Sequence, residues 1–202
     1  MKRFLFIIFL LLTCSRSTVT AQSDQQTQAI VNRTLELLLH ERGAMMDYQA
    51  TIGGIYTIKA KMFYRGNKKQ LVTKKHITWF DGEKYWVLDR RKNEVQIKQK
   101  KKENTGGMED WFKMAKTNCT FTMKEQKDGY RVLVKNRDKA AKIKEATVLV
   151  DKNTFKPIWL KCRFFLINIT VHINEFKTMN LSEDVFHFNP KDYPNAKVVN
   201  EK

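Results

Sequence analysis

The chain has 202 residues, of which 38 are Lys or Arg and 21 are Asp or Glu, giving a formal net charge of +17. Its three prolines and eight glycines form no linker-like run, so we expect a single folded domain behind any targeting segment. The positive charge favours contact with an anionic lipid, nucleic acid or an acidic protein; the alternative is that it only keeps the protein soluble.

The first 21 residues have the three parts of a secretory signal peptide. Lys2 and Arg3 are charged, residues 4–12 are uniformly apolar, and residues 19–21 have the small-x-small pattern of a cleavage site. The apolar run is shorter than the roughly 20 residues that a membrane-spanning helix needs. We therefore expect cleavage after residue 21 and a soluble exported domain of residues 22–202. Three basic residues leave with the segment, which lowers the charge from +17 to +14, and export argues against nucleic acid.

Cys14 offers a second reading of the same segment. The sequence from Leu11 to Cys14 loosely resembles a lipobox, in which the cysteine is lipidated and becomes the new N-terminus. Thr13 is bulkier than the residues usual at that position. Simple cleavage remains the preferred interpretation, and an anchored protein is the alternative.

The mature part opens with a predicted helix. Ser23 or Asp24 can cap it, because their side-chain oxygens accept hydrogen bonds from free N–H groups. Gly43 is placed to end it in a left-handed conformation. One face is apolar, so the helix must bury it against a larger element; this stripe consists of Val31, Leu35, Leu38 and Leu39.

Almost everything after the helix is typical of β-strands. Residues 56–64 alternate along the chain, and residues 75–80 and 84–88 flank Asp81-Gly82, a strong hairpin signal. Residues 167–173 alternate most cleanly, which predicts one buried and one wet face. Further strands are expected at 94–98, 119–124, 130–135, 146–150 and 157–166.

These nine or ten segments are joined mostly by short turns, so consecutive strands should pair antiparallel. A sheet of this size must twist and curl into a partly or fully closed barrel. The pattern excludes a doubly wound nucleotide-binding fold.

One segment interrupts the strands. Gly106-Gly107 is a flexible joint, and residues 108–115 predict a short helix with one apolar face. The interpretation with most functional content is a lid over a cavity, with Met108, Trp111 and Phe112 against the sheet. The alternative is an ordinary capping helix.

Several of these motifs together resemble the LolA family of periplasmic lipoprotein carriers. The Gly-led strand at 54–56, the hairpin around Asp81-Gly82 and the turn at 148–158 each match the family's pattern. The most specific match is the ending Phe186-His187-Phe188-Asn189-Pro190 followed by Tyr193-Pro194. The family's lid-holding sheet arginine has no clear counterpart; the strand after Tyr56 carries Lys59 and Lys61 instead.

The resemblance implies an α+β fold: a strongly curved antiparallel sheet, an incomplete barrel of about 10–11 strands, with helices over its concave face. It implies a monomeric carrier without a cofactor, which takes lipoprotein acyl chains or another lipid from an inner-membrane release complex to an outer-membrane acceptor, with transient membrane contact. The cavity and lid candidates are Tyr56, Ile58, Met62, Trp79, Trp86, Met108, Trp111, Phe112, Phe121, Leu160, Phe164 and Val171.

Site chemistry argues against an enzyme. The four histidines have no metal-ligand spacing, and no nucleophile elbow or Walker loop occurs. Two other classes stay open: a lipid-sensing regulatory domain of the same fold, and an exported structural β-protein that binds no lipid.

Cys119 and Cys162 are the two cysteines of the mature chain. An oxidising compartment would allow a disulfide between them, with two separately buried thiols as the alternative.

Overall fold

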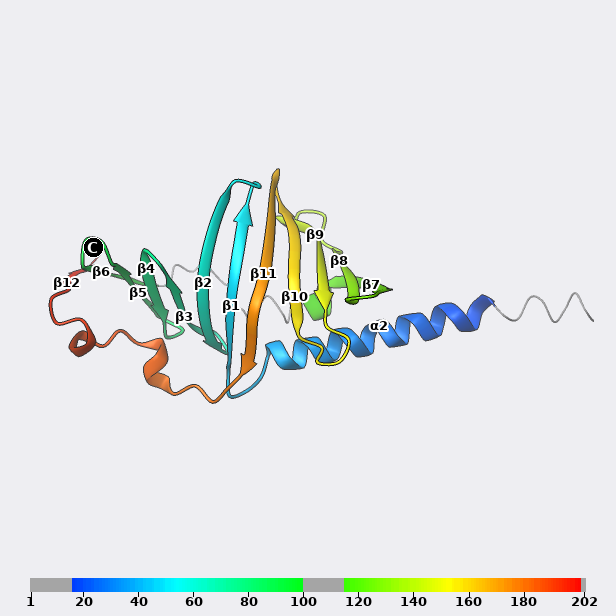
Figure 1. The fold of residues 1–202 in the computed structure, drawn as a ribbon, viewed down its shortest axis with the longest axis horizontal. Helices are drawn as coiled ribbons and strands as arrows, with labels where there is room; N and C mark the ends of the chain where they lie inside the picture. The colour runs from blue at the N-terminus through cyan, green and yellow to red at the C-terminus, as the bar shows by residue number, and fades with distance from the viewer. Residues whose placement is uncertain (1–15, 100–114, 201–202) are drawn as a thin grey trace, which may run out of the picture.

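The computed structural model describes residues 16–99 and 115–200, which include one long helix and a single curved sheet of 12 strands (Figure 1). The strand order is β12-β6-β5-β4-β3-β2-β1-β11-β10-β9-β8-β7. Neighbours pair antiparallel, except that β12 runs parallel to β6. The strands are β1 (Ala44–Ile52), β2 (Tyr56–Arg65), β3 (Lys68–Thr73), β4 (His76–Phe80), β5 (Lys84–Asp89), β6 (Glu94–Gln99), β7 (Cys119–Gln126), β8 (Gly129–Asn136), β9 (Ile143–Val150), β10 (Pro157–Phe164), β11 (Ile167–Thr178) and β12 (Lys197–Asn200).

The predicted fold class is confirmed: the sheet is antiparallel, strongly curved and not closed, since β7 and β12 lie at its two ends. Three strands were not predicted, β1, β3 and β12. In β1 the first three residues, Ala44 to Met46, are all buried, because both faces of the sheet are covered at that point. No alternation of polar and apolar residues therefore marks this strand in the sequence.

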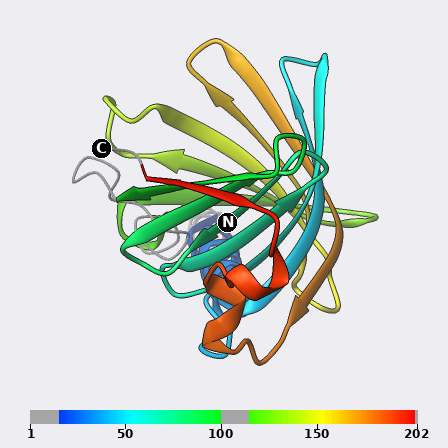
Figure 2. The ribbon, with the colours of Figure 1, turned by 90° about the vertical axis from the view of Figure 1, so that its left-hand side faces the viewer.

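Helix α2 (Arg16–Leu38) lies against the concave face, and the sheet curves around it (Figure 2). Near its C-terminal end Leu38 packs with Met46 and Met62, while Ile30 and Val31 pack with β8 and β9. The predicted apolar stripe is thus the packed face. The helix begins before the predicted caps, at Arg16. Within the described residues, no helix is both long and apolar enough to cross a bilayer.

Gly43 is left-handed as predicted, with φ of 101°, but it lies beyond the helix end, in the turn into β1. A Cβ at this position would come within 2.9 Å of the Tyr64 carbonyl oxygen and 2.8 Å of the Leu181 side chain. The glycine therefore allows both the turn and the close approach of the C-terminal segment.

The C-terminal segment, containing the 3-10 turns η1 (Glu183–Phe186) and η2 (Pro190–Asp192), covers the convex face of β3 to β6. The Trp79 ring lies 5.5 Å from the ring of Phe188 and 5.6 Å from that of Tyr193, both edge-on. Arg65 bonds to the carboxylate of Glu183, which also accepts from Lys68 at 2.7 Å. The family-like C-terminal motif is thus a structural cover.

We predict that Trp79→Ala lowers the free energy of unfolding by about 3–5 kcal/mol, because this ring is buried between the sheet and the C-terminal segment. Only 3% of Trp79 is exposed, whereas Trp86 on the same face is half-buried. Trp86→Ala is therefore the matched control and should cost less. Denaturant unfolding of both variants measures the difference; equal losses would contradict this account of the convex cover.

Candidate functional site

Strand register sorts the predicted cavity residues onto the two faces of the sheet. Ala50 on β1 lies opposite Ile58 on β2 and opposite Val171 on β11. Val171 in turn lies opposite Leu160 on β10. Because directly opposed residues share a face, these side chains all lie on the concave face that also carries Met62, which packs with α2.

The concave face carries two continuous apolar rows, each crossing seven strands from β2 to β7. The first, the inner row, consists of Ile58, Ala50, Val171, Leu160, Val148, Val132 and Met123. The second, the outer row, consists of Tyr56, Ile52, Ile169, Cys162, Ala146, Val134 and Phe121. Neither row contains a charged residue.

Helix α2 covers only part of these rows. At the β7–β9 end, Val132 is buried and Met123, Phe121 and Val148 pack against the cluster that contains Ile30. From β9 to β2, every member outside that cluster is half-buried or exposed. Among the described residues nothing covers this stretch, the apolar groove, which consists of Tyr56, Ile58, Ala50, Ile52, Val171, Ile169, Leu160, Cys162 and Ala146.

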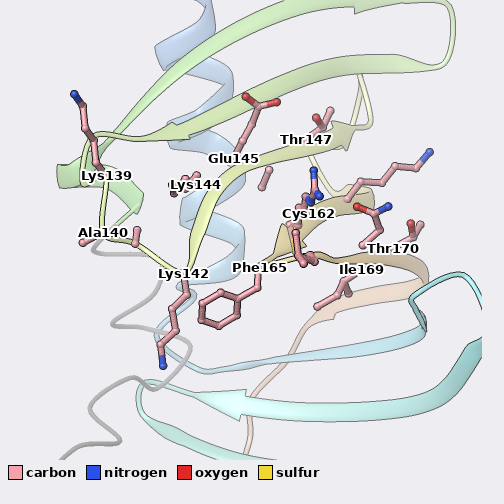
Figure 3. Close-up of a pocket in the computed structure, with 16 residues that line it drawn as sticks. Lys139, Ala140, Lys142, Lys144, Glu145, Thr147, Cys162, Phe165, Ile169 and Thr170 are labelled. Atoms are coloured by element: carbon pink, nitrogen blue, oxygen red, sulfur yellow. The ribbon is translucent and has the colours of Figure 1, made fainter.

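A hollow of about 1030 Å³ adjoins the groove beside β9, β10 and β11 (Figure 3). Ala146, Cys162 and Ile169 of the outer row line it, together with Phe165 and Leu166 from the β10–β11 turn. Its remaining lining has one acidic residue, Glu145, five small or polar residues, and five cations, which are Lys139, Lys142, Lys144, Lys161 and Arg163. The site therefore combines an apolar surface with a cationic border.

Seven of the predicted residues lie on the concave face: Tyr56, Ile58, Met62, Phe121, Leu160, Phe164 and Val171. Met62 is buried in the cluster with Leu38, and Phe121 packs against the cluster with Ile30, so those two are core. Tyr56, Ile58, Leu160 and Val171 belong to the groove, and Phe164 lies at its β10 end, opposite Ile167.

Trp79 and Trp86 lie on the opposite face, so the prediction that they line the same cavity is wrong. Trp79 lies opposite Trp86 across β4 and β5, and both pack with the cluster of Ile77, Leu88 and Val95 beneath the C-terminal segment. Alternation along β4 shows that one face is apolar, but it does not say whether that face is concave or convex.

The predicted lid lies outside the described residues, including Met108, Trp111 and Phe112; of the predicted helix only Ala115 is described. The lysines that stand in place of the family's sheet arginine are described. Lys61 lies opposite Asp47, and its amino group is 3.8 Å from that carboxylate. This pair and Lys59 are on the convex face, so these two lysines are not placed to hold a lid over the groove.

Cys119 and Cys162 are free thiols, and the disulfide considered from the sequence is not formed. Two strands, β8 and β9, separate β7 from β10. Three strand spacings amount to roughly 14 Å, far more than the separation of about 4.4–6.8 Å between the Cα atoms of bonded cysteines. Cys162 instead contributes a small apolar side chain to the groove.

The sequence did not indicate five groove residues, Ala50, Ile52, Ala146, Cys162 and Ile169. Ile169 was placed in a strand with one buried face, and Val171 on the same face of that strand was predicted as a cavity residue. The alternation along this strand therefore contained the signal for Ile169. Ala50 and Ile52 were missed with β1 itself. Among the described side chains, no three His, Cys, Asp or Glu residues are grouped to hold a metal ion.

Comparison with protein families gives a match to a model described as outer membrane lipoprotein carrier protein LolA, which covers residues 17–164. Comparison with curated proteins gives no match.

Solved structures of similar fold include a conserved protein from Thermus thermophilus, 14% identical, with a TM-score of 0.56 over 87% of this chain and 99% of that one. A LolA superfamily protein from Nitrosomonas europaea is 8% identical, with a TM-score of 0.41 over 80% of this chain and 97% of that one. A chain of the MucA/MucB complex of Pseudomonas aeruginosa is 11% identical, with a TM-score of 0.46 over 82% of this chain and 62% of that one. Of these three, the Thermus thermophilus protein is the one whose TM-score, 0.56, supports a similar fold.

We predict two free thiols per mature chain when the unreduced, denatured protein is titrated, and three where residues 1–21 are retained. In the native protein, burial raises the pKa of Cys162, and at Cys119 burial raises the pKa by more than Arg137 lowers it. Alkylation at neutral pH should therefore be slow and should keep accelerating as the pH rises past 9.0, the ordinary thiol pKa in both cases. A titration that finds no thiol would contradict the structure.

Proposed function

The chain belongs to the LolA family of outer membrane lipoprotein carrier proteins, and on this premise we propose that it binds the acyl chains of lipoproteins in the apolar groove. It acts as a carrier in the periplasm, between an inner-membrane release complex and an outer-membrane acceptor. Export by a cleaved signal peptide of residues 1–21 is part of the same proposal, as is a binding rather than a catalytic role.

The observation that supports this proposal most is the part of the two apolar rows that α2 leaves uncovered. Side chains such as Ile58, Leu160 and Val171 lie on the concave side of a curved sheet, yet remain half-buried rather than buried. A contiguous apolar surface of this kind on a soluble domain is typical of a binding site.

Acyl chains match this surface because neither partner needs a polar group. Each buried methylene contributes about 0.8 kcal/mol, so roughly ten buried methylenes contribute about 8 kcal/mol. Affinity then depends on the apolar area covered and not on hydrogen bonds. Such binding accepts many lipoproteins that share only their acyl chains.

Release must come from a partner, since no nucleotide-binding motif accompanies the groove. An acceptor with a larger apolar surface would draw the chains away down a gradient of affinity. The predicted lid at 108–115 would keep water from the groove between the two encounters.

We predict that Val171→Asn lowers the amount of co-purified lipid about tenfold, because an amide buried against acyl chains without a partner costs about 1–3 kcal/mol. The matched control is His172→Asn on the same strand, since His172 is exposed on the convex face. Extraction and mass spectrometry of protein purified from the periplasm give the measurement. Equal lipid in the two variants would reject the groove as the site.

Ala50→Phe provides a second test in which the fold should survive. If the groove is open, the added ring fills space that acyl chains would occupy, so lipid is lost and the melting temperature hardly changes. If Ala50 is instead in a closed core, overpacking costs about 1–3 kcal/mol and the melting temperature drops. Thermal unfolding and lipid analysis of the same sample separate the two.

Transfer between membranes distinguishes a carrier from a lipid sensor. A carrier should move a labelled lipoprotein from donor to acceptor membranes, and Ala50→Phe should abolish that transfer. Lipid binding without transfer would favour the sensing role, and the absence of any bound lipid would favour a structural protein.

A further inference from the structure

Exposed apolar side chains of the described chain gather at one place. Seven large hydrophobic residues are exposed in all, and five of them lie at one end of β1, β2, β10 and β11. These five form the apolar tip: Ile55 (93% exposed), Tyr56 (56%), Phe165 (66%), Leu166 (82%) and Ile167 (46%). Single exposed apolar residues need no explanation, but such a cluster does.

Two adjacent turns build the tip. Ile52 lies opposite Tyr56 on one side and opposite Ile169 on the other. The Gly53 N–H donates to the Asn168 carbonyl at 2.8 Å, which ties the β1–β2 turn to the β10–β11 hairpin. Ile55 is therefore held next to the hairpin that carries Phe165 and Leu166, where the two hairpins stand at the top of the sheet (Figure 1).

The β10–β11 turn is poorly suited to its own sequence. It has only two residues, and Phe165 has φ of 53°, the left-handed region that bulky residues avoid. A two-residue hairpin turn with positive φ at its first residue alone favours Gly at that residue, and Phe165 is the one of the two turn residues with positive φ. Phe-Leu here aids neither the turn nor solubility, so its presence calls for another function.

Charge is divided unequally between the two rims of the sheet. The rim with the apolar tip, the tip rim, has hairpin turns at 53–55, 74–75, 90–93, 137–142 and 165–166. These turns contain eight basic residues and one acidic residue, Asp138. The hairpin turns of the opposite rim, at 66–67, 81–83, 127–128 and 151–156, contain three basic and four acidic residues.

Lys142 of the 137–142 turn and two further cations lie close to the tip. Lys142 and Lys144 line the same hollow as Phe165 and Leu166, and so does Arg163 (Figure 3). All three are exposed, and none forms an ion pair with a carboxylate of the described residues.

We propose that the tip rim docks on an anionic phospholipid bilayer, with Ile55, Phe165 and Leu166 inserted among the acyl chains and the surrounding lysines and arginines on the phosphates. An apolar wedge within a basic border is complementary to such a surface in both chemistry and charge. The opposite rim, with its mixed charge, offers no such match. Docking places the outer row, which is the row nearer the tip, next to the membrane. It does not depend on acyl chains binding in the groove.

The test uses the exported protein and co-flotation with vesicles of phosphatidylcholine, with and without phosphatidylglycerol. The variant is Phe165→Gly with Leu166→Asn, which removes the wedge and places Gly at the residue with positive φ. It should remain at least as stable as the parent, while its partition onto anionic vesicles falls about tenfold or more. Met179→Ser, which removes an exposed apolar side chain away from the tip (38% exposed), should bind like the parent.

A second experiment tests the role of charge. It compares the double variant Lys142→Gln, Lys144→Gln with a control on the opposite rim, Lys127→Gln, Lys156→Gln. The first pair should weaken binding to anionic vesicles severalfold and the second should not, and the difference between them should shrink in high salt. Unchanged binding of the Phe165→Gly, Leu166→Asn variant would overturn the proposal. So would a parent protein that self-associates through the tip and loses this association in the variant, because a second copy would then cover it.

These outcomes are separate from those for the groove. Ala50→Phe should bind vesicles like the parent even though it carries no lipid. If Ala50→Phe loses no lipid while the tip variant fails to dock, the groove proposal falls and the docking proposal stands.

Discussion

An antiparallel sheet that curves but does not close into a barrel has two unlike faces, and other segments of the chain must cover both. The architecture follows from this constraint. Helix α2 covers the concave face at its β7–β9 end and near the start of β1, while the C-terminal segment covers the convex face of β3 to β6. Neither reaches the concave surface around Ile58, Val171 and Leu160. The groove is what the two covers leave, and its apolar character continues from a core on either side.

Groove and tip share the same strands, which relates the two proposals physically. The outer row runs from Tyr56 through Ile52 and Ile169 to Cys162, and the two apolar turns lie directly beyond it. An acyl chain that leaves a bilayer at the tip would meet apolar side chains throughout its path. The cations that border the hollow would remain at the level of the phosphates.

The fold class and most strands could be predicted from alternation and turn residues, because a half-covered antiparallel strand has period two. The prediction of strands failed where this condition is not met. Ala44 to Met46 are buried on both faces, and β3 is short and begins with two lysines. Assigning a residue to the concave or the convex face was harder than predicting the strand in which it lies. Trp79 and Val171 both look like buried-face residues in isolation, and only the full register, which depends on the undetected β1 and β3, places them on opposite sides. Exposure of Phe165 and Leu166 likewise has no signal in the sequence, where two apolar residues at the end of a strand suggest its continuation.

The central ladder joins the two ends of the chain, since β1 pairs along its whole length with β11, from Ala44 with Thr178 to Ile52 with Ile169. Nearly all of the polypeptide must therefore be present before the middle of the sheet can form. Such non-local pairing makes folding slow, because the entropy of closing a long loop is lost before the contacts are gained. Until β11 arrives, β1 presents an unpaired edge with Met45, Met46 and Tyr48 on it, an aggregation hazard for a nascent chain. A chain of this topology therefore gains from being held unfolded until β11 has been delivered.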